Sequence, residues 1–290
     1  MPDPTQLPLR ELIRRGADFL ERKGIPDAAT VCELLAARLC QCKRMELHRS
    51  LDATLSEPRV DAMRRGIQRV AGGEPVQYVL GQWDFRYLTL KCDRRALIPR
   101  PETEGLVELV LKSTQLNGNP KPLVVDVGTG TGCVILSIAQ EHPGGVYVGL
   151  DISQDALALA VENAKLAGLE DKVMFAESDG CGEFEPASVD ILVSNPPYIP
   201  SAAVDALDPW IRDHEPRLAL DGGADGLNFY RSFLMDAIMV LKSGGAVFFE
   251  IGDDQGTALR DMMEEHGLEE VRILKDLAGR DRYATGVMAG

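Results

Sequence analysis

Short apolar runs alternate with helical segments from residue 123 onward, and this alternation constrains the fold more than any other feature of the sequence. Apolar residues at helical spacing fill most of the intervals between the runs. Seven runs have the character of strands, namely residues 123–127, 146–150, 173–176, 191–194, 246–251, 271–274 and 283–288. This order predicts an α/β fold with a mostly parallel, seven-stranded sheet and helices on both faces. The last two runs are joined by a short turn without a helix, so we expect them to add an antiparallel edge.

The N-terminal part has a different character. Apolar side chains recur at near-helical spacing across residues 7–73, which predicts a small helical bundle. Gly24-Ile25-Pro26-Asp27 interrupts the first two helices, and Asp27 is expected to cap the second. This part contains no glycine-rich loop and no cluster of acids or bases at catalytic spacing. We therefore expect it to bind or orient a partner.

Residues 76–98 connect the two parts. Val76, Tyr78 and Leu80 alternate in a strand-like way, a turn is expected at Gly81, and a second alternating run follows at 85–90. The sequence is therefore divided into a helical substrate-binding domain, a β-hairpin linker and an α/β domain. Their predicted limits are residues 1–75, 76–100 and 101–290.

Composition limits the classes of function. The net charge of −14 argues against a large nucleic-acid footprint, because phosphate contacts require a basic face. The six cysteines and four histidines show no metal-ligand spacing, so no metal is predicted. No apolar run approaches the ~18 residues of a membrane span, and the first residues lack the pattern of a secretory signal. A cytoplasmic location is therefore expected.

A glycine-rich loop follows the first predicted strand of the sheet. Gly128, Thr129, Gly130, Thr131 and Gly132 lie between this strand and a helix, where backbone atoms can approach a ligand closely. The Gly-x-Gly-x-Gly pattern differs from the Gly-x-Gly-x-x-Gly of dinucleotide sites. The absence of a following Gly-Lys-Ser/Thr excludes a P-loop. The alternative is a purely structural tight turn.

Carboxylates end the next two predicted strands. Asp151 lies about 20 residues after the glycines, where a carboxylate can accept both hydroxyls of a ribose, and its alternative role is a helix N-cap. Ser153 or Asp155 could also serve as that cap. Asp179 could accept from an adenine amino group or cap a turn, and Gly180 follows it where an adenine ring would rest.

Asn195, Pro196, Pro197 and Tyr198 indicate the type of reaction. The side-chain oxygen of Asn195 and the carbonyl of Pro196 can each accept one hydrogen of a substrate NH2 group, and Tyr198 offers a flat face to a planar group. Holding both N–H bonds aims a weakly nucleophilic nitrogen at a methyl donor. The proton can leave afterward, so no general base is required before attack. The alternative is a proline-rich turn at the end of a strand.

These motifs resemble those of class I S-adenosylmethionine-dependent methyltransferases that act on planar NH2 groups, which have a Rossmann-like fold. Further segments are similar to the HemK/PrmC family, whose members methylate the glutamine of the Gly-Gly-Gln motif in peptide chain release factors. These segments are residues 75–81, 97–104, 215–223 and 275–282. The resemblance implies S-adenosyl-L-methionine as cofactor, S-adenosyl-L-homocysteine as product, release factors as partners and a role in translation termination.

The resemblance also implies roles for individual residues. Cofactor contacts fall on 128–132, Asp151, Gly180 and Asn195, and glutamine contacts on 195–198. Two places depart from the family: Gly180, where relatives often carry a bulky residue beside the cofactor, and the stretch Arg86-Tyr87-Leu88, which lacks the small residue often found before the leucine. Arg100 and Glu102 could form a surface ion pair or could line the substrate cleft.

Three other functions are alternatives. A methyltransferase for a ribosomal-protein glutamine typically carries Pro-Arg-Ser-Pro where this chain has Pro99-Arg100-Pro101-Glu102. An adenine-amino DNA methyltransferase would need a basic cleft and a target-recognition region. A non-catalytic cofactor-binding scaffold would have no need of the intact 195–198 motif.

Overall fold

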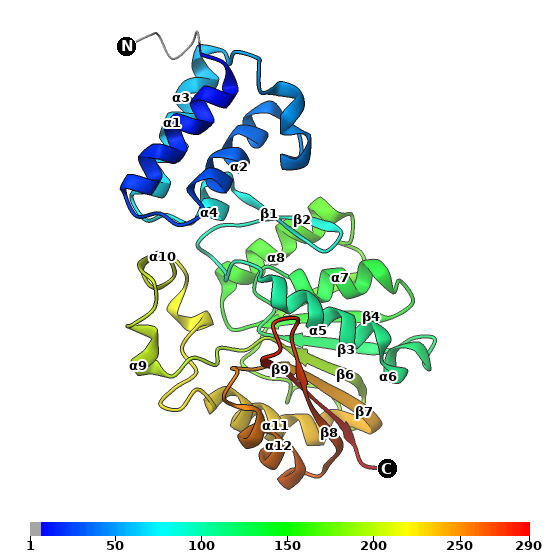
Figure 1. Ribbon diagram of the computed structural model, residues 1–290. Coiled ribbons are helices and arrows are strands. Elements are labelled where there is room, and N and C mark those ends of the chain that lie inside the picture. The colour runs from blue at the N-terminus through cyan, green and yellow to red at the C-terminus, as the bar shows by residue number, and fades with distance from the viewer. Residues whose placement is uncertain (1–6) are drawn as a thin grey trace. The chain divides into compact units, whose positions relative to one another are not determined.

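The computed structural model describes residues 7–290, which form two compact units (Figure 1). The first unit contains the described residues up to Gly81 together with Pro209–His214. The second contains Gln82–Asp208 and Glu215–Gly290. The predicted division at residues 75 and 100 stays a prediction.

The first unit is helical. Its elements are α1 (Leu9–Arg22), α2 (Ala28–Cys40), the 3-10 helix η2 (Arg44–Ser50), α3 (Glu57–Ala71), α4 (Val76–Leu80) and α10 (Pro209–Arg212). Leu9, Leu20 and Cys32 are fully buried in its apolar core. The expected capping by Asp27 is wrong, because this residue has a left-handed backbone (φ 51°) and its side chain makes no cap hydrogen bond.

The prediction of a strand over Val76, Tyr78 and Leu80 is also wrong, because this segment is helix α4. The side chains that pack against the helical core are Val76, Val79 and Leu80, which have the i, i+3, i+4 spacing of a helix. Gly81 ends α4 with φ 71° and does not turn a hairpin. A shorter hairpin follows in the second unit, where β1 (Gln82–Phe85) pairs antiparallel with β2 (Leu88–Lys91).

The second unit contains the predicted seven-stranded sheet. Its strands are β3 (Leu123–Val127), β4 (Val146–Asp151), β5 (Val173–Glu177), β6 (Val189–Ser194), β7 (Leu241–Glu250), β8 (Leu268–Lys275) and β9 (Asp281–Met288). The strand order is β5-β4-β3-β6-β7-β9-β8. The first five strands in this order are parallel, and β9 pairs antiparallel with both β7 and β8. The predicted fold class is confirmed.

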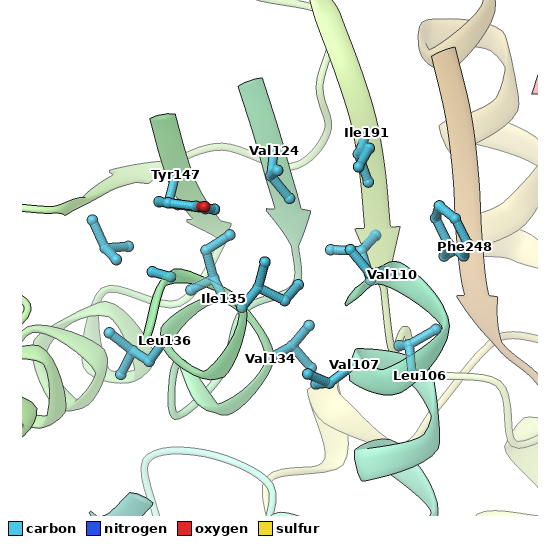
Figure 2. Close-up of a cluster of buried hydrophobic side chains, with 14 of the residues drawn as sticks. Leu106, Val107, Val110, Val124, Val134, Ile135, Leu136, Tyr147, Ile191 and Phe248 are labelled. Atoms are coloured by element: carbon cyan, nitrogen blue, oxygen red, sulfur yellow. The ribbon is translucent and has the colours of Figure 1, made fainter. Parts of the chain in front are cut away.

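Helices cover both faces of this sheet (Figure 1). Successive residues of a strand point to opposite faces, so Val124 joins one core cluster while Val125 joins the other. On the first face, α5 (Pro101–Lys112) and α7 (Cys133–Glu141) pack against β3, β4, β6 and β7, as Figure 2 shows. The opposite face is covered by α11 (Asn228–Val240) and α12 (Gly256–Glu265). The remaining elements are α6 (Thr114–Asn117), α8 (Gln154–Ala167), α9 (Ser201–Val204) and the 3-10 helix η3 (Arg217–Ala219).

The carboxyl ends of the parallel strands meet at one edge of the sheet, where ligand sites of open α/β sheets lie. The glycine loop follows β3, Asp151 ends β4, and Asn195 follows β6. Ser194 Oγ donates a 2.6 Å hydrogen bond to the carbonyl of Val127, which joins the end of β6 to the end of β3. The fold therefore brings the glycine loop and the 195–198 segment together.

Candidate active site

The glycine loop has a backbone that only glycine adopts readily at three positions. Gly128, Gly130 and Gly132 have φ of 76°, 56° and 81°. A Cβ on Gly128 would meet no protein atom within 4 Å, so the backbone conformation requires glycine there. The amides of Gly128 and Thr129 both donate to the carbonyl of Leu150 at 2.8 Å, which fixes the loop against β4.

Asn163 of α8 holds the other end of the loop. It is fully buried and donates from Nδ2 to the carbonyl of Thr131 at 2.9 Å, while its Oδ1 accepts from the amide of Lys91 at 2.7 Å. One side chain thus ties the glycine loop to the end of β2. Sequence reasoning missed Asn163, because a single polar residue within a predicted helix carries no sign of such a contact.

Asp151 is held by two backbone amides. Its Oδ2 accepts from Gly130 at 2.8 Å and its Oδ1 from Ser153 at 2.9 Å. Burial raises the pKa of this carboxyl, and the amides oppose that shift. Ser153 Oγ accepts from the amide of Ala156, so Ser153 caps α8 and Asp151 does not. The carboxylate keeps lone pairs that are free to accept further donors.

Asp126 lies beneath the loop. It is 1% exposed, and Thr129 Oγ1 donates to it at 2.7 Å. Burial raises the pKa of this carboxyl to about 7. Asp126 lies near the end of β3, and its hydrogen bond with Thr129 stabilises the glycine loop.

A cavity of about 270 Å³ lies over this edge of the sheet. It is lined by eight of the predicted site residues: Gly128, Thr129, Gly130, Thr131, Asp151, Asp179, Asn195 and Pro197. Four others do not line it, namely Gly132, Gly180, Pro196 and Tyr198. The geometry therefore brings most of the predicted cofactor residues to one cavity.

Gly180 lies against α11. A Cβ on this residue would approach Asp236 Oδ2 to 2.6 Å, so the side chain of Asp236 occupies the space that a larger residue would need. Asp236 therefore accounts for the glycine at a position where relatives often carry a bulky residue. The predicted contact of Gly180 with the cofactor stays a prediction.

Asn195 is oriented by a chain of hydrogen bonds. Its Nδ2 donates to Thr103 Oγ1 at 3.1 Å, and Thr103 Oγ1 donates to Glu250 Oε2 at 2.7 Å. No described residue donates to Asn195 Oδ1, which leaves this oxygen as an acceptor at the cavity wall. Sequence reasoning missed Thr103 and Glu250 as site residues. The available signal was a charged residue at the end of the apolar strand β7.

Tyr198 is held from two sides. Its hydroxyl lies 3.5 Å from Glu250 Oε1, and its carbonyl accepts from Gln255 Nε2 at 2.9 Å. Burial raises the pKa of Tyr198 to about 12, so the phenol stays protonated at neutral pH. The side chain can therefore contribute a rigid aromatic surface and not a base.

Arg100 lines the cavity, but its partner is not Glu102. The Arg100 guanidinium pairs with Glu215 at 2.5 Å, and Glu215 also accepts from the amide of Ile98 at 3.0 Å. The Glu215 side chain is 1% exposed. Of the two alternatives for these residues, the Arg100–Glu102 ion pair is wrong, because a buried carboxylate from a distant segment binds Arg100 instead.

Two absences apply to residues 7–290. No group of three or more histidine, cysteine, aspartate or glutamate side chains there could hold a metal ion. Within the same range, no helix combines the length and the apolar character that a bilayer crossing requires.

Comparisons with known proteins agree with this geometry. The family described as PrmC N-terminal domain matches residues 11–81, and the methyltransferase small domain matches residues 107–223. The release factor glutamine methyltransferase of Caulobacter vibrioides is 36% identical over 273 residues, covering 93% of each chain. That of Moorella thermoacetica is 38% identical over 275 residues, covering 94% of this chain and 96% of the relative.

Solved structures share the fold. The hMettl16 catalytic domain, in complex with MAT2A 3'UTR hairpin 1, superposes with a TM-score of 0.55 at 14% identity, covering 89% of this chain and 90% of that one. A methyltransferase from Pyrococcus furiosus has a TM-score of 0.50 at 16% identity, covering 70% and 90%. At these identities the likeness concerns the fold alone.

Proposed function

We propose, because the chain belongs to the release factor glutamine methyltransferase family, that it transfers a methyl group from S-adenosyl-L-methionine to the side-chain nitrogen of the glutamine in the Gly-Gly-Gln motif of peptide chain release factors. The observation that carries this proposal is the oriented amide of Asn195 at the wall of the cavity. Its free oxygen is the acceptor that a substrate NH2 group requires.

The glycine loop and its neighbours fit the cofactor. Asp151 has the acceptor chemistry for the two ribose hydroxyls, and its two amide donors hold it in place. Asp179 lines the same cavity and would accept from the adenine amino group. S-adenosyl-L-methionine supplies an electrophilic methyl group when it is bound.

The 195–198 segment would hold the substrate amide. Asn195, which lines the cavity, would accept a hydrogen bond from one N–H through Oδ1, and the carbonyl of the adjoining Pro196 would accept from the other. Tyr198, held by Gln255, would restrict the plane of the glutamine side chain. An amide nitrogen is a poor nucleophile, because its lone pair is delocalised into the carbonyl. Fixing both N–H bonds removes rotational freedom and favours the electron distribution of the transition state. The proton can then leave after the N–C bond has formed.

The helical unit would bind the release factor, since its described residues carry no cluster of buried polar groups that could perform chemistry. The partner is then a protein and not a nucleic acid, which agrees with the net charge of −14. We also place the activity in the cytoplasm, where translation termination takes place.

The test is methyl transfer to a purified release factor. The enzyme and S-adenosyl-L-methionine are incubated with the release factor, and mass spectrometry of its peptides should locate one added methyl group on the Gly-Gly-Gln glutamine. A release factor with that glutamine replaced by alanine is the matched control. Methylation of a ribosomal protein in place of the release factor, or no transfer by a folded enzyme, would refute the proposal.

A further inference from the structure

Glu250 is a buried carboxylate that forms no ion pair with another described residue. It ends β7, is 2% exposed, and forms no ion pair within 4.0 Å among the residues that the structure describes. Its carboxylate accepts from Thr103 at 2.7 Å and lies 3.5 Å from the Tyr198 hydroxyl. A buried charge with so few partners destabilises a protein, so its retention requires a reason other than stability.

The chemistry of the groups fixes the direction of each hydrogen bond. An ionised carboxylate can only accept, so the single hydroxyl hydrogen of Thr103 is directed to Glu250. Thr103 Oγ1 must then accept from Asn195, and only the NH2 end of that side chain can donate. The carbonyl end of Asn195 is therefore the end that remains at the cavity.

We propose that Thr103 and Glu250 are positioning residues, which hold the Asn195 side chain with its carbonyl oxygen toward the substrate amide only while Glu250 is ionised. This inference rests on the proposed function of Asn195. If the amide turned over, its NH2 group would face the NH2 group of the substrate. Two donors cannot form a hydrogen bond with one another, so the substrate nitrogen would lose one of its two acceptors.

Protonation of Glu250 would reverse the direction of the hydrogen bonds that link Glu250, Thr103 and Asn195. A neutral Glu250 can donate to Thr103 Oγ1, and Thr103 can then donate to Asn195 Oδ1, which turns the NH2 group to the cavity. Burial raises the pKa of Glu250 to about 7, and the hydrogen bond from Thr103 and the charge of Arg282 oppose that rise. The other titratable groups that act on Glu250 or that it influences are Glu102 of α5, Cys133 of α7, Tyr198, Tyr230 of α11 and Tyr283 of β9.

The first test compares two variants of Thr103 in the full chain. Thr103→Val removes the hydroxyl and keeps the shape, while Thr103→Ser keeps the hydroxyl. We expect Thr103→Val to lower kcat by about tenfold to a hundredfold, and S-adenosyl-L-methionine to bind within about twofold of the parent protein. Thr103→Ser should keep kcat within about threefold. A Thr103→Val enzyme that binds the cofactor and keeps the parent kcat would overturn the inference.

The second test is the pH profile of kcat/KM, which also applies if Thr103→Val does not fold. The ionised form is the active one, so activity should fall as the pH is lowered through about 7. Glu250→Gln should abolish this acidic limb. Asp126→Asn is the control, because burial raises the pKa of that carboxyl to about 7 as well. An acidic limb that persists in Glu250→Gln and disappears in Asp126→Asn would overturn the role of Glu250.

A third readout needs no substrate. In protein labelled with 15N at asparagine, the side-chain NH2 signals of Asn195 should shift with the protonation of Glu250 and should not titrate in Glu250→Gln. If the parent protein does not methylate a release factor but shows this titration, the proposed function fails and the positioning chain stands. The range from pH 6 to 8 brackets the pKa of Glu250, which burial raises to about 7. If the signals do not titrate within this range, the proposed hydrogen-bond link from Glu250 through Thr103 to Asn195 is refuted.

Discussion

The two units differ in what they bury. In the helical unit, the buried residues among those described are apolar, with Leu20, Cys32 and Ala36 fully enclosed. The α/β unit encloses apolar clusters too, but it also contains all of the buried polar and charged side chains found within residues 7–290. Those are Thr103, Asp126, Thr129, Thr131, Ser137, Asp151, Asn163, Ser194, Glu215, Glu250 and Gln255.

This difference separates packing from chemistry. Burying a polar or charged group costs free energy unless it is hydrogen-bonded, so such groups persist where a site needs them. Most of the buried polar residues of the α/β unit lie in or beside the cavity, as Asp151, Thr103 and Glu250 illustrate. The helical unit therefore depends on apolar packing for its fold, and we propose that the α/β unit depends on its buried polar groups for its activity.

Asn195→Ala should have the largest effect on activity. The variant loses the acceptor of the substrate amide, so kcat should fall by about 10²–10³-fold, the range seen when one preorganised group at a reacting centre is removed. The affinity for S-adenosyl-L-methionine, measured by calorimetry, should change far less. Equal losses in kcat and in cofactor affinity would contradict the role of Asn195 on the substrate.

Leu20→Ala should act on stability and not on chemistry. Leu20 is fully buried in the helical unit, so its truncation should lower the free energy of unfolding by about 2–5 kcal/mol. Cofactor affinity should be unchanged, since the cavity is lined by residues of the α/β unit alone.

Leu106→Ala is the matched control for this variant. Leu106 is equally buried but lies in α5, which also carries Thr103, so this variant should lower both stability and kcat. Urea titration and steady-state kinetics measure the two effects. A lower cofactor affinity in Leu20→Ala would show that the apolar packing of the helical unit also affects the cofactor site of the α/β unit.

Asp151→Asn should weaken cofactor binding and leave the fold intact. The amide keeps the size of the side chain but loses the charge and one acceptor oxygen, so the Kd for S-adenosyl-L-methionine should rise by about tenfold to a hundredfold. Thermal unfolding without cofactor should show a loss of stability of about 1 kcal/mol, because one of the two backbone amides that now donate to the carboxylate, Gly130 or Ser153, would face the NH2 group of the new side chain. An unchanged Kd would exclude Asp151 from cofactor binding.

Local sequence patterns predicted much of the fold and several of the residues that line the cavity. The alternation of strands and helices predicted the sheet, because the spacing of apolar residues is a property of neighbouring positions. The glycine loop and Asp151 were found for the same reason, since each directly follows or ends a strand. The error at α4 arose because a segment of five residues is too short to distinguish the two-residue period of a strand from the 3.6-residue period of a helix. The packing of Val76, Val79 and Leu80 on the helical core decided for the helix.

Long-range pairings could not be predicted. Thr103 and Glu250 are 147 positions apart, and Arg100 and Glu215 are 115 apart, so no local pattern connects them. Arg86 was noted only as part of the stretch 86–88, which departs from a family pattern. In the structure its guanidinium binds Glu141 at 2.6 Å and Glu108 at 3.1 Å, which fastens the hairpin to α7 and α5. Arg86 therefore has a structural role that only the fold reveals.

The smallest expected effect concerns how Glu250 changes stability with pH. Its folded-state pKa is raised to about 7 from 4.5, so the folded protein binds the proton more tightly than the unfolded chain. The stability from this group is fully present below pH 4.5 and is lost as the pH rises through about 7. Glu250→Gln cannot ionise, so it should be more stable than the parent protein at pH 8 by about 1 kcal/mol, after the weaker hydrogen bond with Thr103 is taken into account. Urea unfolding at pH 5 and pH 8 measures this, and the advantage should shrink at pH 5. A Glu250→Gln protein that is more stable than the parent at pH 5 and less stable at pH 8 would mean that the buried charge of Glu250 stabilises the fold. Glu250 would then no longer be an example of a polar group that the α/β unit buries for activity at a cost in stability.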